Sequence, residues 1–228
     1  MKNLKDFINE TLLDDFDKLS DLANVKDDIR QFLKDNYKLS SKFRISKKPN
    51  KDGLYEVDCK HFTGRFDYVG VINKNIHRLT NGSFVFINVV DFDCHLCQNL
   101  TSLEGAPEEV KGNFCCGYNR NLTSLKGAPK KVGDKFECLD CPNLTSLEGA
   151  PEIVGGTFRC NNCPNLKSLK GAPKEVKYDF NCTNCQDLTS LEGAPKKVGT
   201  FSCDSIFTEE DVKKVCNVLS GKINIYRG

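Results

Sequence analysis

The 228-residue chain contains no tryptophan, one methionine and three histidines, and its net charge is only +2. So small a net charge provides no strong electrostatic attraction to nucleic acid or to a membrane surface. No apolar run approaches the roughly 20 residues that a membrane-spanning helix needs. The first ten residues, MKNLKDFINE, lack the apolar core of a signal peptide. We therefore expect a cytoplasmic protein that binds neither membranes nor nucleic acid.

The chain also lacks a phosphate-binding loop, a nucleophile elbow and a pair of catalytic carboxylates. His95 lies between Cys94 and Cys97, so a cysteine–histidine nucleophile pair is conceivable. However, Cys94 is expected to face the core and His95 the solvent, and the sequence identifies no third residue that would orient the imidazole. We therefore predict that the protein is not an enzyme and has no catalytic residue, cofactor or metal ligand.

Repetition dominates the sequence, because a 22-residue unit recurs five times between residues 92 and 207. The segment PNLTSLEGAPEIVGGTFRCNNC (142–163) represents all of the copies. The leading leucine recurs every 22 residues (122 − 100 = 22), at Leu100, Leu122, Leu144, Leu166 and Leu188. A fixed period of this length indicates a solenoid, in which stacked units bury the apolar side that no single unit can bury alone.

The pattern within one unit resembles the leucine-rich repeat, whose consensus is L-x-x-L-x-L-x-x-N/C-x-L. Phe158 and Cys160 are two residues apart, so both point to one side of a short strand, and they occupy the L-x-L positions. Cys163 occupies the Asn/Cys position, and Leu166 and Leu169 are the apolar residues that follow. The unit departs from the consensus by one extra residue before the strand and another after Cys163.

The tail of each unit, Leu-Thr-Ser-Leu-x-x-x-Pro, looks most like the short leucine-rich repeats of bacterial secreted effectors. Those repeats have extended convex sides in place of helices, and the Gly-Ala-Pro run agrees because proline and glycine disfavour helix. The resemblance implies a β-dominated, leucine-rich-repeat-like solenoid with short parallel strands on its concave face and helices only toward its ends. The expected strands are centred on Phe92–Cys94, Phe114–Cys116, Phe136–Cys138, Phe158–Cys160 and Phe180–Cys182.

Charge alternates from each unit to the next. The residue after the second leucine carries the alternation, in the order Glu104, Lys126, Glu148, Lys170 and Glu192. Stacked units lie about one strand spacing apart, ~4.8 Å, so each charge would lie beside opposite charges. A second column, starting at Glu108, alternates as well until Lys196. Exposed pairs contribute only about 0.2–1 kcal/mol each, so we interpret them as devices for register and solubility.

Thirteen cysteines allow two interpretations. The Cys-x2-Cys pairs at 138–141 and 160–163 are separated by 18 residues, which fits a four-cysteine zinc site. Alternatively, the thiols stack as small apolar groups inside the solenoid, which agrees with their consensus positions and with Asn119 replacing cysteine in the second copy. We expect no disulfides, because the cytosol keeps thiols reduced.

The N-terminal segment, residues 1–45, is expected to be helical. Apolar residues recur at helical spacing in residues 2–13 and again in residues 21–36. These two amphipathic helices would form either a cap or a hairpin that binds a partner.

The remaining chain divides into three segments. Residues 46–91 are expected to contain degenerate capping repeats, with Asn73 at the Asn/Cys position. Residues 92–207 form the regular array. Residues 208–228 form a C-terminal cap, in which a helix begins after Thr208 and extends to Leu219, before a last short strand.

Two main classes of function fit this architecture. In the first, the protein is an interaction module that binds a polar protein partner on the concave face of the solenoid. In the second, the array is a spacer and the N-terminal helices dock into a larger assembly, while a zinc-binding repeat protein is a third possibility. The candidate partner-binding residues are the outward strand positions, which are mostly polar: Asp93, His95, Asn113, Cys115, Lys135, Glu137, Leu139, Arg159, Asn161, Asp179, Asn181, Thr183, Ser202 and Asp204.

The first ten residues carry a second resemblance. An apolar patch precedes the sequence Ile8-Asn9-Glu10. This start looks like the targeting helix of internal head proteins of large contractile-tailed bacteriophages, in which a prohead protease cuts after an apolar-x-Glu motif. The Cys-bearing Gly-Ala-Pro repeat also resembles repeat proteins of such phages. The resemblance implies a virion protein that is delivered to the host cytoplasm and binds a host protein there. An ordinary amphipathic helix would show the same pattern and remains the alternative.

Overall fold

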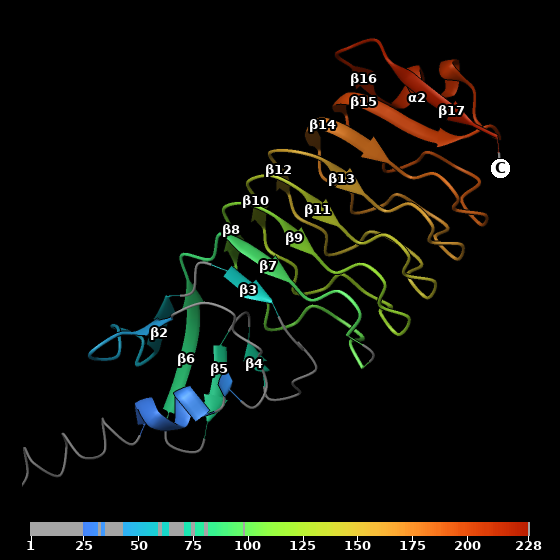
Figure 1. Ribbon diagram of the computed structural model, residues 1–228. Helices are drawn as coiled ribbons and strands as arrows, with labels where there is room; N and C mark the ends of the chain where they lie inside the picture. Colours follow the sequence, from blue (N-terminus) through green and yellow to red (C-terminus); the bar gives the residue numbers. More distant parts are fainter. Residues whose placement is uncertain are drawn as a thin grey trace, which may run out of the picture.

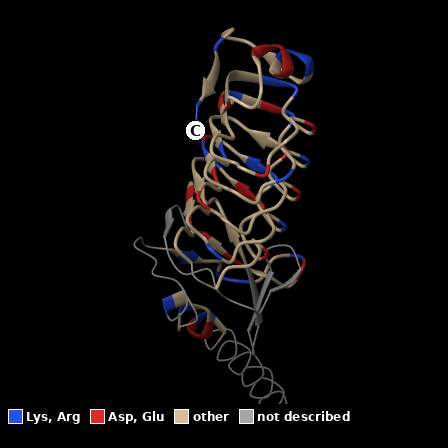
Figure 2. Cartoon of the chain, turned by 90° about the vertical axis from the view of Figure 1, so that its right-hand side faces the viewer, with Lys and Arg blue, Asp and Glu red and all other residues tan. Residues whose placement is uncertain are grey.

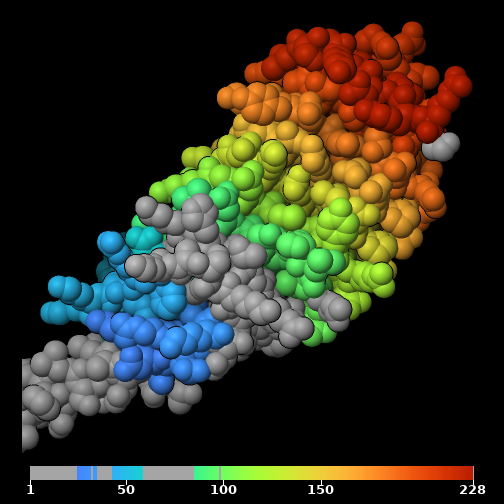
Figure 3. Space-filling view, viewed as in Figure 1, coloured from blue at the N-terminus to red at the C-terminus, as the bar shows by residue number. Residues whose placement is uncertain are grey.

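The computed structural model describes residues 25–31, 33–34, 43–58, 61–63, 71–73, 76–79, 82–97 and 99–227. Most of these residues form an elongated β-solenoid, whose coils follow one another along the long axis (Figure 1). The space-filling view shows the coils as consecutive colour bands (Figure 3). These stacked coils confirm the predicted β-dominated repeat solenoid with parallel strands. No described helix is long and apolar enough to cross a membrane.

Each regular coil contributes strands to two parallel ladders. The first ladder contains the expected phenylalanine strands, and its register places residues one repeat apart side by side, as in Phe136 and Phe158. It consists of β3 (His61–Thr63), β7 (Asp91–Asp93), β9 (Phe114–Cys115), β11 (Phe136–Glu137), β13 (Phe158–Arg159), β14 (Glu175–Asn181), β15 (Lys197–Asp204) and β17 (Ile223–Tyr226).

The second ladder lies on the side that was expected to be extended, where no strands were specifically predicted. It consists of β8 (Glu109–Val110), β10 (Lys131–Val132), β12 (Ile153–Val154), parts of β14 and β15, and β16 (Asn217–Val218). The inward residue is valine in each of these strands, and β-branched side chains suit a pleated, half-buried surface. These strands are only two residues long, and they pair because each neighbouring coil places its two equivalent residues beside them in register.

A stack of phenylalanine rings forms the core behind the first ladder. From Phe92 to Phe201, ring centroids of adjacent coils lie 5.2–5.4 Å apart. All six rings are fully buried. Stacked aromatic pairs contribute about 0.5–1.5 kcal/mol each beyond the burial of their area. The stack therefore fixes the register of the strands and, with it, the columns of side chains on their outward side.

Leucine and cysteine columns complete the core. The two leucines of every repeat are buried, as are all but one of the described cysteines. The thiol of Cys163 donates to the carbonyl oxygen of Cys138 in the preceding coil, at 3.4 Å. Asn119 does the same with its amide, which donates to the carbonyl oxygens of Cys94 at 3.0 Å and Cys116 at 2.9 Å. The stacked thiols and the equivalence of cysteine and asparagine at this position are thus confirmed.

The alternating charges form ion pairs between neighbouring coils, and Figure 2 shows acidic and basic residues following one another along the solenoid. The Nζ of Lys126 lies 2.7 Å from Oε1 of Glu104, and the Nζ of Lys170 lies 3.0 Å from Oε1 of Glu148. Further pairs join Glu108 to Lys130, Glu109 to Lys131 and Glu175 to Lys197. The last two belong to a third column, on the second ladder, that sequence analysis missed.

Residues before β7 depart from the expected capping repeats. A separate five-stranded sheet has the order β1 (Arg44–Ile45), β2 (Tyr55–Asp58), β6 (Gly82–Ile87), β5 (Ile76–Leu79) and β4 (Val71–Asn73). Its pairs β4–β5 and β5–β6 are antiparallel, so the placement of Asn73 at a repeat turn is wrong. The antiparallel register pairs Leu79 with Gly82, so β5 and β6 are neighbouring strands of a hairpin and do not follow the repeat spacing. Only β3, among the described strands before β7, pairs with the coils.

The N-terminal helices are described in part. Residues 25–31 and 33–34 are helical, within the second expected helix, and Val25, Ile29 and Leu33 are buried. The first expected helix, at residues 2–13, and the Ile8-Asn9-Glu10 motif lie outside the described residues.

Helix α2 (Glu209–Val215) begins where the sequence indicated. Thr208 accepts a hydrogen bond from the backbone N–H of Asp211, whose carboxylate accepts one from the N–H of Thr208, so the capping box is complete. The expected extension of the helix to Leu219 is wrong, because residues 217–218 pair with β15 as β16, and Leu219 is 57% exposed. Since β16 and β17 extend both ladders, residues 208–227 form one more coil that contains a helix.

Candidate functional site

The outward side of the first ladder forms a continuous surface, which we call the strand face. Side chains alternate along a strand, so the residues on either side of each buried phenylalanine point outward. The register aligns these residues in columns across the coils. One column contains Asp93, Cys115, Glu137, Arg159, Asn181 and Ser202.

Of the fourteen outward residues predicted from the sequence, all but two are at least partly exposed. The exceptions are Thr183 and Ser202, which are 9% and 6% exposed. The hydroxyl of Thr183 donates to Oδ1 of Asn181 at 2.8 Å, so it folds back onto its own strand. Asn224, which lies beside Ser202 on the neighbouring strand β17, donates to Oγ of Ser202 at 3.1 Å, so this hydroxyl is already hydrogen-bonded. Neither residue is available to a partner.

Just after each strand, the chain turns through a residue with left-handed backbone. The angle φ lies between 55° and 58° at Leu96, Tyr118, Asp140, Asn162 and Asn184. Asparagine and aspartate tolerate this conformation, whereas it costs bulkier residues about 1–2 kcal/mol. In the later coils these residues also pair, since Asn162 donates to Asp140 at 3.2 Å and Asn184 donates to Asn162 at 2.9 Å.

Leu96 and Tyr118 break this pattern. Their side chains are 64% and 49% exposed, so two large apolar groups face solvent from strained positions in consecutive coils. Leu139, partly exposed, follows on the next coil, where its carbonyl accepts from the N–H of Tyr118 at 2.9 Å. We call Leu96, Tyr118 and Leu139 the apolar patch. Of these three residues only Leu139 was predicted from the sequence, although leucine and tyrosine stand at a position that is Asp or Asn in the other copies.

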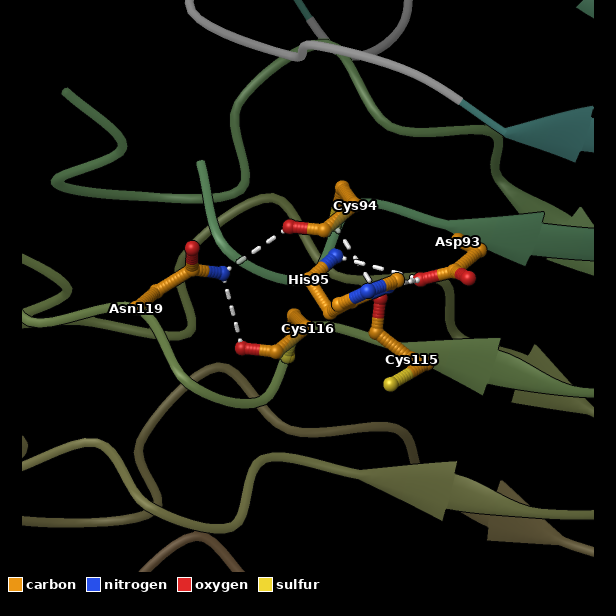
Figure 4. A network of polar contacts seen from close by, with 6 residues as sticks. All are labelled: Asp93, Cys94, His95, Cys115, Cys116 and Asn119. Carbon is orange, nitrogen blue, oxygen red and sulfur yellow. Dashed lines mark hydrogen bonds and ion pairs between the residues drawn. The ribbon is translucent and has the colours of Figure 1, made fainter. Parts of the chain in front are cut away.

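Asp93, His95 and Cys115 form a polar cluster on the same coils as Leu96 and Tyr118 (Figure 4). Nδ1 of His95 lies 2.6 Å from Oδ1 of Asp93, which also accepts from the backbone N–H of His95 at 3.1 Å. Cys115 lies opposite Asp93 in the ladder. One donor atom of each residue lies within 4.8 Å of the others. Asp93 is thus the orienting partner of the imidazole that the sequence did not reveal, while Cys94 faces the core as expected.

The cluster is poorly suited to nucleophilic catalysis. Burial raises the pKa of the Cys115 thiol to about 11; the backbone N–H of Gly117 lowers it, while the carboxylates of Asp93 and Glu137 raise it further. A catalytic cysteine needs the opposite shift, because the thiolate is the nucleophile. Sulfur, imidazole and carboxylate are nevertheless the side-chain ligands of borderline-soft metal ions.

The Cys-x2-Cys copies are placed differently. Burial raises the pKa of Cys141 and Cys163 to about 12, although a backbone hydrogen bond lowers each somewhat. Their thiols also donate to backbone carbonyl oxygens inside the core, Cys141 to Cys116 at 3.5 Å and Cys163 to Cys138 at 3.4 Å, so they point away from solvent. Among the residues that the structure describes, three metal-ligating side chains come together at Asp93, His95 and Cys115. The absence of zinc at the Cys-x2-Cys copies stays a prediction, with a zinc-binding repeat protein as the alternative, for metal analysis to test.

Comparison with known proteins gives no relative from which a function could be transferred. No family model, curated protein or solved structure matches the chain. The resemblances to leucine-rich repeats and to phage proteins therefore stay hypotheses, and the function has to be inferred from the strand face itself.

Proposed function

We propose that the protein is an interaction module that binds a protein partner on its strand face, with the apolar patch at the centre of the contact. The exposed pair Leu96 and Tyr118 carries the proposal. Binding energy at interfaces concentrates in a few large side chains that a polar rim surrounds, and tyrosine is prominent among them. Strained backbone at an exposed position is retained where the side chain it presents has a use.

The surroundings of the patch favour a partner that is polar apart from one apolar contact. Lys135, Arg159 and Asn161 lie on the next coils with Glu137, which accepts from Arg159 at 3.1 Å. This mixture of signs gives the strand face no uniform field, so it suits a protein surface better than a polyanion.

The solenoid is, in this proposal, a variant of the leucine-rich repeat. Its support is the inter-coil hydrogen bonding of Asn119 and Cys163 at the consensus Asn/Cys position. The second parallel ladder is the main departure from the extended side expected of that family. A phage origin would make the partner a host protein, and its support is the sequence resemblance of residues 1–10 and of the repeat.

The alternative of docking through the N-terminal helices is less well supported. It would use the apolar stripes of residues 2–13 and 21–36; the first lies outside the described residues, and Val25, Ile29 and Leu33 of the second are buried. A stripe that is already packed against the protein is not free to bind a partner.

The decisive variant is Leu96→Asn combined with Tyr118→Asn. Asparagine suits the left-handed backbone, so the variant keeps its fold while it loses both apolar side chains. A partner would be captured from lysate on immobilised wild-type protein, purified, and titrated against both proteins. Because a hot-spot residue contributes at least about 2 kcal/mol, we expect binding to weaken by about 30-fold or more.

The matched control is Ile153→Asn, which removes a 55%-exposed apolar side chain from the second ladder. This variant should bind the partner as the wild type does. Equal affinity of the wild type and the Leu96/Tyr118 double variant would refute the proposed site.

A further inference from the structure

Strands of two neighbouring coils hold Asp93 and Cys115, and His95 lies in the turn directly after the first of these strands. Asp93 of β7 and Cys115 of β9 are directly paired in the parallel ladder, and His95 follows β7 by two residues. The phenylalanine stack behind them, with Phe92 and Phe114 centroids 5.2 Å apart, fixes the separation of the two strands. Sites built on such elements hold their geometry better than sites on loops.

The arrangement occurs at one place in the described solenoid. In the column of Asp93 and Cys115 the next coils carry Glu137 and Arg159, and in the column of His95 the next coil carries Gly117. The other copies of the repeat therefore do not place a histidine, a cysteine and a carboxylate side by side. Their combination belongs to the first two regular coils alone.

We propose that Asp93, His95 and Cys115 together bind one divalent cation of the borderline-soft class, with Zn²⁺ as the best match. Zinc takes sulfur at about 2.3 Å and nitrogen or oxygen at about 2.0–2.2 Å, so tetrahedral ligand atoms lie roughly 3.3–3.8 Å apart. The three donors already lie within 4.8 Å of one another, so modest side-chain rotations bring them to a shared ion.

The site is open rather than closed. Three protein ligands leave a fourth position for water, as in zinc sites that are not purely structural. All three side chains are at least partly exposed, so an ion can enter without unfolding. The hydrogen bond between Asp93 and His95, 2.6 Å long, holds the imidazole and the carboxylate together before the ion arrives. The site is separate from the Cys-x2-Cys copies, whose thiols point into the core.

The test uses full-length protein freed of metal with a chelator under reducing conditions. Calorimetric titration with Zn²⁺ should give one equivalent bound, and Co²⁺ should give a thiolate-to-cobalt absorption band. His95→Ala and Cys115→Ser should each weaken Zn²⁺ binding by more than about 100-fold, since loss of an outer partner alone weakens metal sites by about 10–100-fold. Cys115→Ser should also abolish the cobalt band.

The control is Asp179→Asn, which neutralises an exposed carboxylate on the strand face three coils beyond Cys115 and should leave Zn²⁺ affinity unchanged. Circular dichroism melts of each variant establish that the fold is intact. Absence of Zn²⁺ binding by the wild type would overturn the site. Undiminished binding by both His95→Ala and Cys115→Ser would also overturn it, by placing the ion elsewhere, for instance at the Cys-x2-Cys copies.

Discussion

At the scale of single residues, the turn after each strand shows how backbone conformation selects side chains. Asp140, Asn162 and Asn184 occupy a left-handed position that suits them, and they link neighbouring coils by hydrogen bonds. Leu96 and Tyr118 occupy the same position, but their side chains lack the amide and carboxylate groups that link the later coils. Stability alone would favour asparagine at both positions, and in the proposed function the apolar side chains are retained for binding.

We therefore expect Leu96→Asn and Tyr118→Asn each to stabilise the protein, by about 1 kcal/mol, through relief of backbone strain. Urea unfolding of the single variants measures this directly. The same substitution at Ile153, whose backbone is an ordinary strand, should not stabilise. A loss of stability in both turn variants would show that the two side chains serve the fold after all.

Asn119 offers a second residue-scale test. Its amide satisfies two carbonyls, but its own Oδ1 is buried without a hydrogen-bond partner in the described part of the protein. Asn119→Cys restores the residue of the other copies and removes the unpaired oxygen, so it should change the free energy of unfolding by less than about 1 kcal/mol. Asn119→Ala removes the amide that donates to the carbonyl oxygens of Cys94 and Cys116 and should cost about 1–3 kcal/mol. Equal thermal and urea stability of the two variants would contradict this account.

At the scale of strands and coils, the closeness of neighbouring backbones limits the side chains that fit between them. Gly133 follows β10, and its N–H donates to the carbonyl oxygen of Val110 at 2.9 Å. A Cβ atom at this glycine would overlap the carbonyl oxygen of Lys111 in the preceding coil. The clash is with backbone, which cannot rotate away as a side chain could.

Gly133→Ala should therefore destabilise the protein by about 1–3 kcal/mol or more, as overpacking does. Gly53→Ala is the comparison, because a Cβ there meets nothing within 4 Å and only its φ of +75° opposes the change, at about 1 kcal/mol. Urea melts of both variants decide the matter. If Gly133→Ala destabilised the protein less than Gly53→Ala, neighbouring coils would have to lie farther apart than described.

The sequence predicted some of these elements well and others poorly, for physical reasons. The phenylalanine strands follow from residues two apart that repeat every 22 residues, a signal present in each copy. The second ladder was missed because its strands of two residues have no periodicity of their own and exist only through pairing. The Asp93–Cys115 contact was missed because it depends on register, although aligning the copies at 22-residue spacing would have revealed it. The antiparallel sheet of β4, β5 and β6 lies where the repeat has decayed.

At the scale of the whole molecule, the stacked thiols make the free energy of unfolding depend on pH. Burial raises the pKa of Cys141, Cys163 and Cys185 to about 12 from an ordinary value of 9.0. A raised pKa means that the folded protein holds these protons more tightly than the unfolded chain. The stabilisation is therefore fully present below pH 9 and is lost as the pH rises toward 12.

We expect the free energy of unfolding to fall as the pH rises from 9.0 toward about 12, measured in urea with a reducing agent present. Replacing Cys163 by alanine should lower stability at pH 8 but reduce its dependence on pH. A stability that stayed constant over this range would mean that the thiols are less buried than described.

Because charge alternates between neighbouring coils, it matters whether an odd or an even number of repeats is removed. Removing one repeat, residues 126–147, would set Glu148 beside Glu104 and Glu152 beside Glu108, whereas removing two, residues 126–169, would restore opposite charges in both columns. The unit that can be gained or lost without electrostatic conflict is thus a pair of coils, 44 residues (2 × 22), although the structural repeat is a single coil. Added salt should stabilise the one-repeat deletion more than the two-repeat deletion, because it screens exposed like charges. Such a protein would then gain repeats two at a time.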